Sequence, residues 1–125
     1  MMPTERTAES YTRWLAESPR EVDAWVHETV FGVDRECSDP LWESPRFYTS
    51  DANAADLVRE RVALLERDFQ VSWVYRVAVL SMQSGMMVDA MIHARPPHYV
   101  GAAWLLGDEV WRELRERTQI AIDDH

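Results

Sequence analysis

The chain has 125 residues, with 13 basic and 22 acidic side chains and a formal net charge of −9. Its hydrophobic fraction of 46% excludes a disordered chain, and its acidity argues against a general binder of the nucleic-acid phosphate backbone. A single cysteine, Cys37, excludes an internal disulfide framework.

No segment of the sequence approaches the roughly 18 apolar residues of a membrane span. The first ten residues also lack the apolar region of a signal peptide. We therefore expect a soluble, cytosolic protein that forms one domain over residues 1–125, with a core at about 20–117 and a loose tail at 118–125.

Two helices are predicted in the first 32 residues. The first runs from Glu5 to Glu17, because its apolar residues recur at helical spacing: Ala8, Tyr11, Trp14 and Leu15. The second begins at a capping box, in which Ser18 is the N-cap, Pro19 takes the first helical position and Glu21 reaches back. Gly32 is placed to end this helix in a left-handed turn.

An irregular segment and a third helix are predicted next. The segment spans residues 33–49, and its aromatic side chains either pack into the core or face a ligand: Trp42, Phe47 and Tyr48. Ser50 or Asp51 then caps a helix. One face of that helix is apolar and consists of Ala54, Val58, Val62, Leu65 and Phe69.

From residue 71 to residue 80 the apolar pattern alternates, which predicts a β-strand. Residues 82–85 predict the turn of a hairpin, and residues 87–94 predict its returning strand. Both strands are apolar on both faces for much of their length. We therefore expect helices to cover the sheet from two sides.

The last predicted helix runs from Pro96 to about Arg117 and contains Gly107, which suggests a close crossing of two backbones there. Together the elements predict an α+β fold of order α-α-α-β-β-α. A small antiparallel β-hairpin, or a three-stranded sheet that includes residues 46–49, lies between the helices.

A two-stranded hairpin is only marginally stable in water, so its edge needs a partner. Either residues 46–49 add a third strand, or the edge pairs with a second copy of the chain. Met86, Met87 and Met91 lie near this edge and fit a contact between copies, although methionine also fills gaps in cores. We expect a homo-oligomer.

Several segments occur in the order that one known family shows. Residues 22–32 read VDAWVHETVFG, residues 45–51 read PRFYTSD with Ala54-Ala55 and Val58 after them, and residues 94–106 read ARPPHYVGAAWLL; Trp42 precedes the second segment. This arrangement resembles the phage ABA sandwich domain over about residues 20–115. Residues 96–101 depart from the family's pattern. The resemblance implies a viral origin and a helix–sheet–helix sandwich, and it transfers no catalytic residue.

Arginine and aromatic side chains gather at two predicted helix starts. Arg46 and Tyr48 precede one start, and Arg95, His98 and Tyr99 flank the other. Helix N-termini favour anions, and arginine supplies bidentate contacts to phosphate or carboxylate. If the two starts meet, these residues form a pocket for a nucleotide-like anionic ligand, with Trp42 as a further candidate. The alternative is that they are helix caps and core residues.

The sequence assigns no catalytic residue, metal ligand or cofactor. Asp89 and His93 would lie roughly 13 Å apart along a strand, which is too far to share a metal ion, and no zinc-binding spacing occurs. Cys37 lies among carboxylates, which disfavour the thiolate of a nucleophile.

Three functional hypotheses follow. The first is a phage-encoded, non-enzymatic accessory protein of the host cytoplasm that counters host defence by sequestering a nucleotide-like ligand. The second is an acidic protein-interaction module that docks on a host or phage protein. The third is a small nucleotide hydrolase. Direct binding to nucleic acid or to a membrane is not expected.

Overall fold

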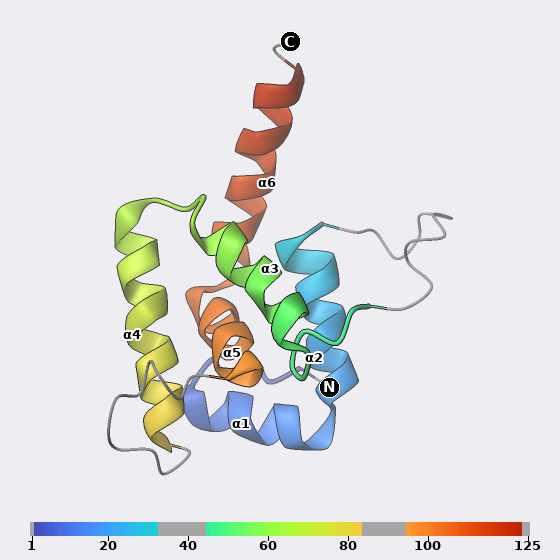
Figure 1. The fold of residues 1–125 in the computed structure, drawn as a ribbon, viewed down its shortest axis with the longest axis vertical. Helices are drawn as coiled ribbons and strands as arrows, with labels where there is room; N and C mark the ends of the chain where they lie inside the picture. Colours follow the sequence, from blue (N-terminus) through green and yellow to red (C-terminus); the bar gives the residue numbers. More distant parts are fainter. Residues whose placement is uncertain (1, 33–44, 84–94, 124–125) are drawn as a thin grey trace.

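The computed structural model describes residues 2–32, 45–83 and 95–123, and these residues form helices joined by short links (Figure 1). In chain order the elements are α1 (Ala8–Glu17), α2 (Pro19–Trp25), the π-helical turn η1 (Val26–Val30), α3 (Ala52–Val62), α4 (Arg67–Gln83), α5 (Pro96–Leu106) and α6 (Asp108–Asp123). No strand occurs in these three ranges. The predicted α+β fold, with its hairpin or three-stranded sheet, is therefore wrong. The predicted returning strand, 87–94, lies outside the described residues.

Helix α5 occupies the centre of the molecule, where it packs against α4, α3 and α1 (Figure 1). Five consecutive residues of α5, Val100 to Trp104, are buried. A helix that is apolar all round needs cover on every side, which explains this central position. Gly101 permits the close packing, because a Cβ there would overlap Tyr11 Cε2 and would lie 2.7 Å from Leu80 Cδ1.

Helix α4 contains the segment that alternation had predicted as a strand. Trp73, Val77 and Leu80 recur at i, i+4 and i+7, so one helical face carries all three into the core. The outward-facing Val71 and Val74 are apolar too, and they hide the helical period. An apolar run that is covered on one side and exposed on the other cannot be assigned by periodicity alone.

Gly107 ends α5, so the single helix predicted for 96–117 is two helices. Its φ of +100° is one that side-chain-bearing residues rarely adopt. A Cβ at Gly107 would meet nothing within 4 Å, so the backbone crossing predicted there is wrong, and the close approach belongs to Gly101. Helix α6 continues to Asp123, past the predicted end at Arg117 and into the predicted tail.

Arg6 joins the end of α5 to the start of α6. Its guanidinium donates to the carbonyl oxygen of Trp104 at 2.8 Å and to Asp108 Oδ1 at 2.8 Å. The same group lies 4.9 Å from the centroid of the Trp104 ring. Arg6, which precedes α1, thus attaches the N-terminal residues to the junction of α5 and α6.

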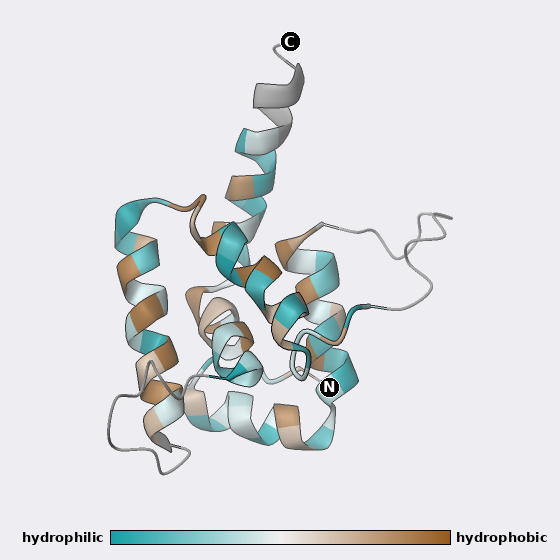
Figure 2. Cartoon of the chain, in the orientation of Figure 1, coloured by the Kyte–Doolittle hydropathy of each residue, from teal (hydrophilic) through white to brown (hydrophobic). Residues whose placement is uncertain are grey.

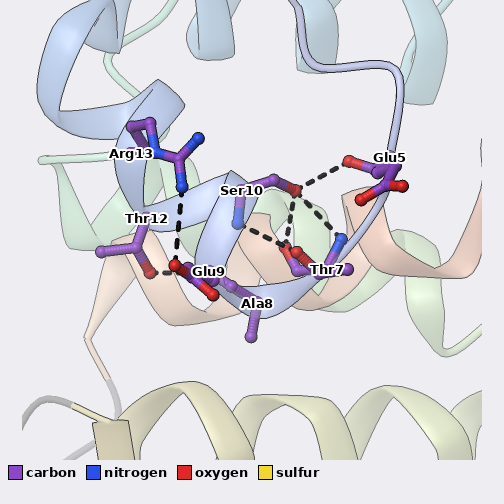
Figure 3. A network of polar contacts seen from close by, with 7 residues as sticks. All are labelled: Glu5, Thr7, Ala8, Glu9, Ser10, Thr12 and Arg13. Carbon is purple, nitrogen blue, oxygen red and sulfur yellow. Dashed lines mark hydrogen bonds and ion pairs between the residues drawn. The ribbon is translucent and has the colours of Figure 1, made fainter.

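Helix α1 begins three residues later than predicted, because Thr7 caps it (Figure 3). Thr7 Oγ1 accepts a hydrogen bond from the Ser10 N–H at 3.0 Å, and Ser10 Oγ accepts one from the Thr7 N–H at 3.0 Å. This reciprocal pair is a capping box. The buried residues of α1, Tyr11 and Trp14, both belong to the predicted stripe.

Helix α2 starts at Pro19, as predicted, but the capping box predicted at Ser18 does not form. The Ser18 side chain makes no cap hydrogen bond, and the Glu21 carboxylate accepts from Trp14 Nε1 at 3.1 Å. The helix widens into η1, which ends before Gly32. The φ of +71° at Gly32 confirms the predicted left-handed turn.

Helix α3 is capped by Asp51, as predicted, since its carboxylate accepts from the Asn53 N–H at 2.9 Å. The helix ends at Val62, so the predicted apolar face does not continue helically to Phe69. Gln70 braces the corner that follows by donating to the carbonyl oxygens of Leu65 at 2.8 Å and Ala63 at 3.3 Å.

Candidate functional site

The segment before α3 is fixed to α2 by Asp23, whose side chain is only 1% exposed. The carboxylate accepts hydrogen bonds from Arg20 at 2.8 Å and from the Thr49 N–H at 2.9 Å. This holds Tyr48 in the core, where its ring stacks on Phe31 with centroids 5.4 Å apart. The Tyr48 hydroxyl lies 3.4 Å from His27 Nδ1, and burial raises the pKa of the phenol. Tyr48 is therefore a core residue.

Arg46 is exposed, and its carbonyl oxygen accepts from the Tyr48 N–H at 2.9 Å. The start of α3 that it precedes already holds the carboxylate of Asp51. A bound anion would have to compete with that negative charge, since both favour the same free N–H groups.

The start of α5 brings Arg95, His98 and Tyr99 together, as their neighbouring positions require. His98 Nδ1 accepts from the Arg95 N–H at 2.9 Å and lies 3.2 Å from Ser81 Oγ. Burial, assisted by the charge of Arg95, lowers the pKa of the His98 imidazole. The Tyr99 ring stacks on Trp73 with centroids 5.5 Å apart.

This helix start offers few donors to an anion. Pro96 and Pro97 have no N–H, and the His98 N–H donates to the Arg95 carbonyl oxygen at 2.9 Å. The other predicted ligand residue, Trp42, lies outside the described residues. The pocket predicted from two helix starts therefore remains a prediction, and the described helix ends supply few groups for it.

Two surface hollows lie elsewhere on the described part of the molecule. The larger has a volume of about 720 Å³, and its polar lining mixes both charges: Arg20, Glu21, Glu28 and Asp108. The smaller, which we call the α3–α6 pocket, has a volume of about 400 Å³. It is lined by Phe31, Gly32, Arg61, Arg115, Glu116 and Thr118.

An exposed apolar face extends along α4, and we call it the α4 stripe. It consists of Val71, Val74, Tyr75 and Met82, whose exposed fractions lie between 43% and 68%. Figure 2 shows hydrophobic residues along the length of this helix. The same helix buries Trp73, Val77 and Leu80 on its other side, so α4 is apolar toward both the core and the surface.

Within the described ranges, no three histidine, cysteine or carboxylate side chains gather where they could hold a metal ion. Among the same residues, no helix is long and apolar enough to cross a membrane.

Comparisons with protein-family models, with curated proteins and with solved structures find no match for the chain. The resemblance to the phage ABA sandwich domain therefore stays a prediction. The sandwich that it implied is not seen, because the segment expected to supply its first strand is part of α4.

Sequence reasoning missed both the α4 stripe and the α3–α6 pocket. The stripe had a signal, since residues 71–80 were recognised as apolar on two faces. The pocket had a weaker one in Gly32, whose left-handed turn was predicted although its contact with Arg115 was not. That contact joins residues far apart in the sequence, and only the fold brings them together.

Proposed function

We propose that the protein acts by binding and that it assembles as a homo-oligomer through the α4 stripe. The observation that carries this proposal is the exposure of Val71, Val74, Tyr75 and Met82. Monomeric proteins rarely expose large contiguous apolar patches, and such patches mark contact sites. The proposed contact is a helical face and not the edge of a hairpin, because residues 67–83 form α4.

The spacing of the stripe suits the pairing of two identical helices. Val71, Val74, Tyr75 and Met82 follow one another at i, i+3, i+4 and i+11, so they share one face of α4. The stripe is about 16 Å long at 1.5 Å per residue. An antiparallel pair of α4 helices around a two-fold axis would bring the same patch of both copies together, as an isologous interface requires.

Charge favours a second copy as the occupant. Helix α4 carries Arg67, Arg76 and Asp68, so its net charge is 2 − 1 = +1 in a chain of net charge −9. Two copies that meet at α4 therefore make contact through a helix that carries none of the excess negative charge of the chain. Their acidic surfaces then stay apart.

We further propose that this assembly is a phage accessory protein of the host cytoplasm. The support for this origin is the resemblance of residues 20–115 described above. Sequestration of an anionic ligand and docking on a host protein are the two modes of action that fit such a role.

Sedimentation velocity and light scattering across a concentration series test the assembly. We expect reversible dimerisation of the wild-type chain and at least tenfold weaker association of Val74→Glu and Tyr75→Glu. Each substitution would place an unpaired carboxylate in the interface, and its desolvation costs on the order of 2 kcal/mol or more.

Leu64→Glu is the matched control. Leu64 is 57% exposed but lies in the link between α3 and α4, outside the stripe, so this substitution should leave association unchanged. A wild-type chain that stays monomeric at every concentration contradicts the assembly. Equal weakening by all three substitutions contradicts its placement on α4.

A further inference from the structure

The α3–α6 pocket contains two arginines that have no carboxylate partner among the described residues. Arg61 comes from α3 and Arg115 from α6. Phe31, which follows η1, lines the same pocket. The Arg61 guanidinium lies 5.3 Å from the centroid of the Phe31 ring. Other arginines of this surface are paired: Arg112 with Glu109 and Glu116, and Arg117 with Glu66 at 3.8 Å.

Arg115 is held in place by the backbone beneath it. Its NH1 group donates to the carbonyl oxygen of Glu28 at 3.3 Å. A Cβ at Gly32 would lie 2.7 Å from Arg115 Cδ and 3.0 Å from NH1, so the glycine makes room for this side chain. The positive φ of +71° and the arginine contact together explain why position 32 needs glycine.

One donor of Arg115 is buried without an acceptor. Its Nε atom has no hydrogen-bond partner among the described residues. Buried polar groups are almost always paired, and a buried charged donor without a partner is costly. Because Nε is closed off from the surface, a ligand in the pocket would meet the terminal nitrogens of Arg115. The positive charge, which no described carboxylate neutralises, favours a negatively charged group there.

We propose that the α3–α6 pocket binds the phosphate group of a small molecule between Arg61 and Arg115. Two guanidinium groups match the several acceptor oxygens of a phosphate, and arginine binds such groups through paired hydrogen bonds. The volume of about 400 Å³ lies in the range of small-molecule sites. This inference does not depend on assembly through α4.

The charge of the whole chain makes the test specific. A protein of net charge −9 repels phosphate at long range. Saturable binding of phosphate would therefore show that the two arginines attract the anion locally, against the repulsion from the whole chain. Glu116, an exposed residue of the same pocket, opposes an anion.

Isothermal titration calorimetry with inorganic phosphate, AMP and adenosine tests the site. We expect the wild-type chain to bind phosphate and AMP saturably, with Kd values of about 1 mM or below, and not to bind adenosine. Arg61→Gln and Arg115→Gln should each weaken binding of both anions roughly tenfold or more. Arg59→Gln, an exposed position of the same helix outside the pocket, should leave the Kd unchanged.

Two further variants separate binding from folding. Arg115→Lys keeps the charge but removes the planar guanidinium that makes paired contacts, and it should bind the anions more weakly than wild type while melting at a similar temperature. Glu116→Gln should strengthen binding several-fold, because it removes a negative charge from the pocket. A purely structural role for Arg115 predicts no such gain.

Three outcomes would overturn the proposal. The first is no saturable binding of phosphate or AMP by the wild-type chain. The second is equal binding of adenosine and AMP, which would show recognition of the base. The third is an equal loss in Arg59→Gln.

Discussion

Glycine serves two different purposes within a few residues of this chain. At Gly107 the backbone adopts a φ of +100°, which ends α5, and the space around the position is open. At Gly101 the helix is regular and the limit is space, because Tyr11 and Leu80 stand where a Cβ would lie. Tyr11 cannot easily move aside, since its ring is buried and its hydroxyl donates to the carbonyl oxygen of Pro97 at 2.7 Å.

Gly101→Ala should therefore destabilise the fold by about 2–3 kcal/mol through overpacking, measured by urea denaturation. In a Leu80→Ala background the same substitution should cost less, because one of the two obstructing side chains is gone. If the cost is equal in both backgrounds, contact with Leu80 does not limit the position.

His98 links α5 to α4 in its neutral form. Its Nδ1 accepts from the Arg95 N–H, and a protonated ring would lose that acceptor. Burial and the charge of Arg95 both lower the pKa of the imidazole. The folded chain therefore binds a proton at His98 less readily than the unfolded chain.

Stability should depend on pH through this residue. The contribution of His98 is full above the ordinary histidine pKa of about 6.5 and falls as the pH drops toward the lower pKa of the folded chain, since the unfolded chain takes up the proton first. NMR titration should give a pKa for His98 below 6.5. The difference in unfolding free energy between wild type and His98→Gln should shrink on acidification, and a pKa above 6.5 would contradict the assignment.

Residue-level reasoning from the sequence worked where the chemistry is local. Pro19, Gly32 and Asp51 mark helix ends by conformational limits or by a short-range hydrogen bond, and the structure confirms each of them. It failed for Gly107, because the sequence shows that a glycine interrupts an apolar run but not whether a neighbour stands against it.

At the scale of elements, α4 is the helix that the sequence pattern predicted wrongly. Four of the helical segments have a cap, a proline or a narrow apolar stripe, and their starts could be predicted within a few residues. Helix α4 has apolar residues toward both the core and the surface, so neither the helical nor the strand period dominates. The core side is set by contact with α5, which the sequence of α4 does not contain.

A substitution at an exposed position of α4 distinguishes helix from strand by the sign of its effect on the free energy of unfolding. Val71 is 61% exposed, so Val71→Ala removes little packing and should stabilise a helix by about 0.5 kcal/mol. In a strand the same change would destabilise. We measure the difference by chemical denaturation in a Tyr75→Glu background, in which we expect association to be weaker, and a loss of stability would contradict the helix.

The candidate site was less predictable than the helices. Tyr48, Tyr99 and His98 were chosen for their residue types, but their rings are held by Phe31, Trp73 and Ser81. Arg61 and Arg115 sit among other arginines on charged helices, and the sequence cannot tell which of these will have a carboxylate partner. That depends on how α3 and α6 lie relative to Phe31.

At the scale of the whole molecule, the arrangement is a set of helices around α5, with α6 projecting from the body (Figure 1). The two proposed contact sites lie on different elements, α4 for a second copy and the α3–α6 pocket for a phosphate group. Assembly and ligand binding can therefore be altered one at a time by the substitutions given above.

The position of α5 also has a consequence for synthesis on the ribosome. The helix that covers α1, α3 and α4 is among the last to be made. Arg6 meets Trp104 only 98 residues later, which takes about 5–20 s at common translation rates. Until α5 has been made, the apolar faces of α1, α3 and α4 that pack against it stay uncovered. A nascent chain that stalls before α5 therefore exposes apolar surfaces of the kind that chaperones bind.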